Sequence, residues 1–90
     1  MNPRERPRRE PGYRLEMVDD ELLLFHPATT RIVYCNATAG LIWRLCDGER
    51  TVGEIVALLT EAYPEAAETL AADVERALEQ LCACRAITLA

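Results

Sequence analysis

Residues 34–56 read YCNATAGLIWRLCDGERTVGEIV, and this segment holds the clearest helix signals of the chain. Asn36 is a good N-cap, because its side-chain oxygen can accept a hydrogen bond from the free amides of a first helical turn. Apolar residues then recur at helical spacing as far as Cys46, and the Asp-Gly pair at 47–48 ends the helix. Thr51 and Glu54 have the spacing of a capping box, so a second helix begins there.

The chain before this segment has the pattern of short strands. Runs rich in apolar, aromatic and β-branched residues occupy positions 13–18, 22–25 and 31–35 and are separated by turn residues, which predicts an antiparallel meander. The second helix is expected to end near Tyr63, because Pro64 follows it, and a third is predicted over residues 68–82. The fold class is therefore α+β, with a three-stranded antiparallel sheet followed by three helices.

Residues 1–12 differ in composition from the rest of the chain. They hold three of the five prolines and no apolar residue after the initiator Met, which is typical of a flexible arm. We therefore divide the chain into a flexible Arg- and Pro-rich arm, residues 1–12, and one folded domain, residues 13–90. The apolar tail, residues 87–89, is expected to dock on the body of this domain.

The charge of the chain is distributed unevenly. The formal net charge is −5, but residues 1–14 carry five Arg against two Glu, so a local +3 is attached to a body of −8. An acidic body repels a phosphate backbone and favours a basic peptide or protein surface. The alternative from another class is a winged-helix nucleic-acid-binding protein whose Arg-rich arm contacts phosphates, and the acidic third helix argues against it.

The remaining composition gives no support for an enzyme or a metal protein. The chain has no run of 18 apolar residues and no secretory signal pattern, so we expect a cytoplasmic location, no membrane partner and reduced thiols. Cys35, Cys46, Cys82 and Cys84 lack the paired spacing of a structural zinc site. His26, the only histidine, is expected at a turn without a nucleophile beside it.

The predicted strands carry more apolar surface than one covered face requires. Because side chains alternate along a strand, Leu22 and Leu24 point one way while Leu23 and Phe25 point the other. A sheet covered by helices on one face should be polar on its other face. The excess indicates an interface, which the arm, the tail, a second copy of the chain or a bound peptide could cover. An extended peptide could add to the open edge of the meander.

Trp43 lies off the apolar stripe of the first helix. A tryptophan in this position is either an anchor for a partner enzyme or a side chain partly buried against the sheet. The sequence leaves both alternatives open.

The segment from Asp20 to Leu89 resembles the family of pyrroloquinoline quinone biosynthesis protein D. Its members are also called recognition elements of ribosomally synthesised, post-translationally modified peptides. The similarity is strongest over residues 34–56, in the order strand, Asn-x-Thr, apolar helix, Asp-Gly and Thr-Val-x-x-Ile-Val. The chain lacks the Arg-Gly and Trp-containing strand pattern of the quinone-pathway members, which favours a different peptide pathway. It also has Ala86 in a region where the family often has Gly.

This resemblance implies a winged-helix-like domain without cofactor or catalytic residues. The leader segment of a precursor peptide would lie as an added strand on the third strand and pack on the third helix. The protein would then deliver it to a separate modifying enzyme or leader peptidase, with a lasso-peptide pathway as one setting. The implied peptide-binding residues are Arg31, Ile32, Val33, Tyr34, Cys35, Asp73, Arg76, Ala77 and Gln80. A proline at Val33 is expected to weaken binding by removing a strand amide.

Overall fold

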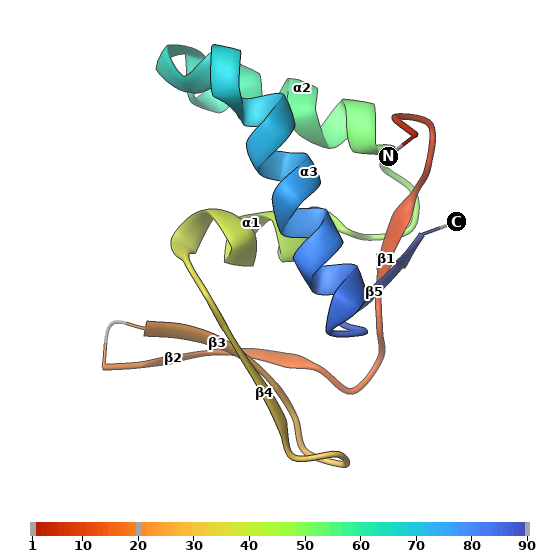
Figure 1. Ribbon diagram of the computed structural model, residues 1–90, viewed down its shortest axis with the longest axis vertical. Helices are drawn as coiled ribbons and strands as arrows, with labels where there is room; N and C mark the ends of the chain where they lie inside the picture. Colours follow the sequence, from red (N-terminus) through yellow and green to blue (C-terminus); the bar gives the residue numbers. More distant parts are fainter. Residues whose placement is uncertain (1, 20, 90) are drawn as a thin grey trace.

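The computed structural model describes residues 2–19 and 21–89 (Figure 1). Within them, the antiparallel sheet β2-β3-β4 is followed by three α-helices, and a second sheet pairs β1 with β5. The elements are β1 (Pro7–Arg9), β2 (Arg14–Val18), β3 (Glu21–His26), β4 (Arg31–Cys35), α1 (Ala37–Leu45), α2 (Val52–Ala62), the short 3₁₀ helix η1 (Pro64–Ala66), α3 (Ala67–Ala83) and β5 (Ile87–Leu89). The predicted α+β class, with a winged-helix-like order of three strands and then three helices, is confirmed.

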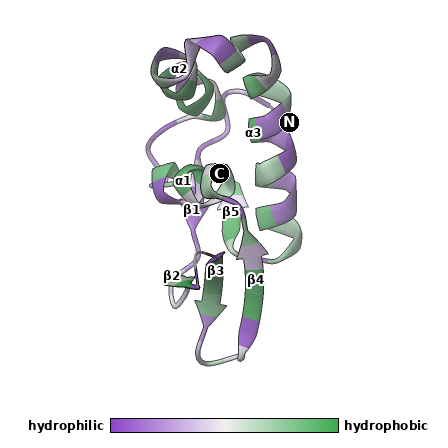
Figure 2. Ribbon diagram, turned by 90° about the vertical axis from the view of Figure 1, so that its left-hand side faces the viewer, coloured by the Kyte–Doolittle hydropathy of each residue, from purple (hydrophilic) through white to green (hydrophobic). Residues whose placement is uncertain are grey.

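The three-stranded sheet packs one face on the helices and leaves the other face open. Leu24 at the centre of β3 is fully buried, whereas Ile32 and Tyr34 of β4 are 51% and 71% exposed. On β3 and β4 both faces are apolar, and Figure 2 shows these two strands hydrophobic along most of their lengths. β4 pairs with β3 on one side. Its other edge carries no strand from the described residues.

The helix starts agree with the capping signals in the sequence. The side-chain oxygen of Asn36 accepts a hydrogen bond from the Ala39 amide at 2.8 Å, at the start of α1. At α2, the Thr51 hydroxyl accepts from the Glu54 amide at 3.1 Å, and the Glu54 carboxylate accepts from the Thr51 amide at 3.0 Å. The predicted capping box is therefore present, and α2 ends at Ala62, two residues before the proline.

A single core joins the sheet to the helices, and Trp43 belongs to it. The indole is 8% exposed, and its Nε1–H donates a hydrogen bond to the carbonyl of Ala86 at 3.3 Å. Of the two alternatives for this residue, burial is what the structure shows. The core members with 5% exposure or less are Leu24, Ile42, Cys46, Ile55, Leu59, Leu70, Val74, Leu78, Leu81, Ala86 and Ile87.

The N-terminal segment is more ordered than its composition predicted. Residues 7–9 form β1, which pairs antiparallel with β5, and Pro7 is fully buried. The Arg9 amide donates to the carbonyl of Cys46, and the Gly48 amide donates to the carbonyl of Pro7, both at 2.9 Å. The expectation of a flexible arm therefore does not describe these residues. The division of the chain at residues 12 and 13 stays a prediction.

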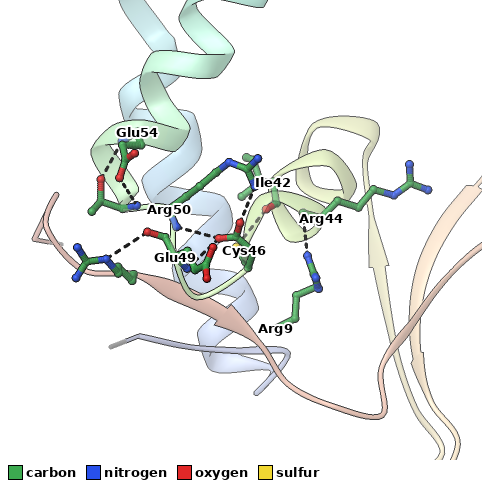
Figure 3. A network of polar contacts seen from close by, with 10 residues as sticks. Arg9, Ile42, Arg44, Cys46, Glu49, Arg50 and Glu54 are labelled. Atoms are coloured by element: carbon green, nitrogen blue, oxygen red, sulfur yellow. Dashed lines mark hydrogen bonds and ion pairs between the residues drawn. The ribbon is translucent and has the colours of Figure 1, made fainter.

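The physical reason for this difference is that hydrogen bonds of the backbone hold the segment. These bonds do not depend on apolar side chains, so the composition does not reveal them. Arginine side chains add to the attachment, as Figure 3 shows for Arg9, whose guanidinium donates to the carbonyl of Arg44 at the end of α1. The same guanidinium lies 5.6 Å from the centre of the Trp43 ring, within the range of a cation–π contact. Arg6 donates to the carbonyl of Glu49 at 3.2 Å.

None of the described helices combines the length and the apolar character that crossing a membrane requires.

Candidate functional site

A wide hollow in the described part of the chain lies beside the end of β4. It has a volume of about 890 Å³ and opens between the β2–β3 hairpin and the helices. The side chains around it are mostly apolar or small, with Glu21 and Gln80 as its longer polar members. Its lining residues are Met17, Glu21, Leu22, Tyr34, Cys35, Asn36, Ala37, Ala39 and Gln80.

A second hollow of about 250 Å³ continues the first along α3. The two share Asn36, Ala39 and Gln80, so they form one continuous depression, which we call the β4–α3 groove. The lining of this second part is more polar. It consists of Asn36, Thr38, Ala39, Asp73, Arg76, Ala77 and Gln80.

Most of the residues expected to bind a peptide come together in this groove. Tyr34 and Cys35 line its first part, and all four predicted helix positions line its walls, namely Asp73, Arg76, Ala77 and Gln80. These positions come together because α3 packs across α1 (Figure 1).

Three of the expected residues do not line the groove. Arg31 points to the end of α3, where its guanidinium donates to the carbonyl of Cys84 at 3.1 Å. Val33 packs against the core, and Ile32 stands on the open face of the sheet. A role for these three residues therefore depends on the backbone of β4 rather than on their side chains, and it stays a prediction.

Sequence reasoning missed the side of the groove formed by the hairpin. Met17 and Leu22 occupy opposite positions on β2 and β3, at the end of the sheet farthest from the β3–β4 turn. Met17 is 69% exposed, which is unusual for an apolar side chain on the helix-facing side of a sheet. The alternation of side chains along a strand places both residues on the face that the helices cover. It does not show that the helices leave this end of the face uncovered.

Gly40 brings α1 close to this hairpin. A Cβ atom at this position would lie 3.1 Å from the Cδ1 atom of Leu22, which is closer than ordinary van der Waals contact. A Cβ atom at residue 40 would therefore require the Leu22 side chain to move by a few tenths of an ångström. The glycine lets the hairpin side chains pack closely against α1.

The register of the sheet indicates which backbone groups of β3 point toward β4. Val18 and Glu21 are paired in the register with two residues between them, and in a hairpin with a two-residue loop the flanking pair is the one that turns its backbone groups toward each other. A central antiparallel strand turns its N–H and C=O groups to its two neighbours at alternate residues. Glu21 therefore turns toward β2, and Leu22 turns toward β4.

The same alternation identifies the free backbone groups of β4. Leu22 is opposite Cys35, so Cys35 and, two residues earlier, Val33 turn their backbone groups inward to β3. Tyr34 and Ile32 consequently turn theirs to the open edge. The proline that tests strand addition therefore belongs at Tyr34 rather than at Val33. The amide of Val33 faces β3 inside the sheet, whereas the amide of Tyr34 faces the open edge.

The electrostatic features of the groove are modest. Arg76 and Asp73 form an ion pair at 3.7 Å on the exposed side of α3. Burial raises the pKa of the Cys35 thiol, so this side chain remains neutral and acts as an apolar part of the wall. The groove therefore presents an apolar end beside β4 and a polar end beside α3.

The described residues contain no set of groups placed to bind a metal. No three of their His, Cys, Asp and Glu side chains come together as metal ligands, and the four cysteines are free thiols. Burial raises the pKa of Cys46 to about 12, so it carries almost no thiolate at neutral pH. His26 ends β3 and contacts the Tyr13 ring edge-on, with 4.9 Å between the ring centres.

The fold and the groove define a small α+β, winged-helix-like domain with an open strand edge beside a helix-lined depression. Residues 21–87 match the family model described as Coenzyme PQQ synthesis protein D (PqqD). Because this match spans most of the chain, the protein belongs to the PqqD family, and the expected family resemblance is confirmed. Strand β1 lies outside the matched residues. No curated protein and no solved structure matches the chain significantly.

Proposed function

We propose that the protein is a non-catalytic recognition element that binds the leader segment of a ribosomally synthesised precursor peptide. The leader adds as a strand to the open edge of β4, and its side chains enter the β4–α3 groove. The protein then delivers the bound precursor to a separate modifying enzyme or leader peptidase in the cytoplasm. A lasso-peptide pathway is one such setting.

The observation that carries this proposal is the open edge of β4 next to the groove. An added strand gains affinity from backbone hydrogen bonds and selectivity from side-chain pockets, and both are available here. Tyr34 joins the two features, because its backbone faces the edge and it is one of the residues that line the groove. Membership of the PqqD family supports the same reading, since it indicates a peptide-binding partner of biosynthetic enzymes.

The charge of α3 favours a peptide over duplex nucleic acid. Its described acidic residues are Glu68, Asp73, Glu75 and Glu79, against Arg76 as its one basic residue. A helix that enters a DNA groove needs the opposite balance, because phosphate contacts dominate the affinity.

The direct test is calorimetric titration with a synthetic leader, taken from a short precursor gene beside the gene for this protein. We expect one-to-one binding with about −8 to −10 kcal/mol, which is micromolar to sub-micromolar affinity. Tyr34→Pro should weaken binding about tenfold or more, because it removes an edge amide as well as the side chain.

Tyr34→Ala is the matched control, because it removes the side chain and keeps the amide. Strand addition predicts that Tyr34→Pro binds clearly more weakly than Tyr34→Ala, with circular dichroism showing that both are folded. Equal affinities would contradict strand addition at β4. A folded wild-type protein that binds no leader from any neighbouring precursor gene would contradict the proposed function as a whole.

A further inference from the structure

The open face of the three-stranded sheet lies on the side away from the helices and shares Tyr34 with the β4–α3 groove. Its side chains form cross-strand rows that follow from the register. One row is Arg14, Phe25 and Ile32, and the next is Glu16, Leu23 and Tyr34. We call these six residues the outer sheet face.

The outer sheet face is apolar on two strands and charged on the third. Phe25 and Leu23 of β3 are half-buried, and Ile32 and Tyr34 of β4 are exposed by half or more. On β2, the face carries one cation, Arg14, and one anion, Glu16. Apolar side chains gathered on an open sheet face indicate an interface.

The arrangement of the two charges makes this face complementary to itself. Consider a second copy stacked face to face about a twofold axis that runs parallel to the sheet and across its strands. Each row then meets the other row of the second copy, since a twofold interface brings the same patch of both chains together. Arg14 lies opposite the second copy's Glu16, Phe25 opposite Leu23, and Ile32 opposite Tyr34.

We propose that the outer sheet face is the interface of a homodimer, with a second copy of this chain as its occupant. Two symmetry-related pairs of Arg14 and Glu16 would set the register at one side, and the apolar residues would be buried beside them. The edge of β4 stays open in this arrangement, because face-to-face stacking does not use strand edges. Face-to-face stacking therefore leaves the β4 backbone edge available to a peptide, and Tyr34 is the residue that both interactions involve.

The size of the face predicts a weak, reversible dimer. Three strands spaced by about 4.8 Å and five residues rising about 3.4 Å each give a face of roughly 14 by 17 Å. This is well below the roughly 800 Å² that each partner buries in a standard stable interface. We expect a dissociation constant in the range of tens to hundreds of micromolar.

The test is sedimentation velocity from micromolar to millimolar concentration with reciprocal charge reversals. Arg14→Glu alone places like charges together across the interface, and so does Glu16→Arg alone, so each variant should dimerise at least tenfold more weakly than the wild type. An equimolar mixture of the two variants restores opposite charges at both pairs. The mixture should therefore associate with an affinity close to that of the wild type.

Glu61→Arg on the exposed surface of α2 is the control and should dimerise like the wild type. Ile32→Glu should abolish dimerisation without relying on the charge pairs, and circular dichroism shows whether each variant is folded. A wild type that stays monomeric at millimolar concentration would overturn the inference. Single reversals that dimerise normally, or a mixture that does not recover, would overturn it as well.

Discussion

At the scale of single residues, two carboxylates stabilise the connection between α1 and α2. Asp47 accepts hydrogen bonds from the amides of Glu49 and Arg50, both at 2.9 Å, and its other oxygen accepts from the Arg50 guanidinium at 2.8 Å. Glu54 accepts from the Thr51 amide in the capping box. Hydrogen bonds from backbone amides, first of all those of Arg50 and Thr51 respectively, lower the pKa of Asp47 and of Glu54.

These lowered pKa values predict a loss of stability in acid. A carboxylate whose pKa is lower in the folded state stabilises the fold above its ordinary pKa, and this contribution disappears as the pH falls through the folded value. The ordinary values are 3.8 for Asp47 and 4.5 for Glu54, so the free energy of unfolding should decrease as the pH falls below 4.5.

Urea denaturation at a series of pH values measures this effect. Asp47→Asn and Glu54→Gln should each flatten the acid slope of the unfolding free energy. Glu61→Gln, in the last turn of α2, should leave the slope as it is in the wild type. Slopes that are identical in all four proteins would show that the two caps do not contribute.

At the scale of elements, the N-terminal strand is held by a few specific contacts. The guanidinium of Arg9 reaches both the Trp43 ring and the end of α1. Arg9→Ala should lower the free energy of unfolding by about 2 kcal/mol, the lower end of one cation–π contact and one charged hydrogen bond combined. Trp43 is the one tryptophan of the chain, so its fluorescence can follow the unfolding transition.

Arg4→Ala serves as the comparison for this variant, because Arg4 is an exposed arginine of the same segment. Its effect on the unfolding free energy should stay within about 0.5 kcal/mol, as for most surface substitutions. If Arg9→Ala is no more destabilising than Arg4→Ala, the contact with Trp43 does not hold β1 in place.

A large side chain on α3 can test whether the leader peptide lies in the groove. Ala77 is half-buried in the polar end of the groove, and Ala71 lies exposed on the same helix, outside the groove lining. Ala77→Phe should weaken leader binding about tenfold or more in a calorimetric titration, because the added ring occupies the space of the peptide.

Ala71→Phe is the matched control for the cost of Phe in a helix, and we expect leader affinity within about twofold of the wild type. Equal effects of the two substitutions would indicate that the peptide does not pass along α3.

At the scale of elements, some parts of the fold and of the groove could be predicted from the sequence and others could not. Helix starts at Asn36 and Thr51 were predictable because capping depends on residues three positions apart. The groove positions on α3 came from the family resemblance, and the structure places all four of them in one lining. β1 could not be predicted, since its partners at Cys46 and Ile87 are distant in the sequence and meet it through backbone groups.

At the scale of the whole molecule, two surfaces of one small sheet are assigned to different partners. The edge of β4 with the adjoining groove is proposed for a leader peptide, and the outer sheet face for a second copy. Residues 1–14 carry a local charge of +3, and within them β1 pairs with β5 and contacts the α1–α2 connection (Figure 1). The open edge is the feature on which peptide binding depends.

The most direct measurement is amide hydrogen exchange of the ¹⁵N-labelled protein, followed by NMR, with and without the leader peptide. Strand addition predicts that the amides of Ile32 and Tyr34 exchange rapidly in the free protein and become protected when the leader binds. The amide of Val33 should be protected in both states, since it faces β3. A leader that binds while Ile32 and Tyr34 continue to exchange rapidly would contradict the account.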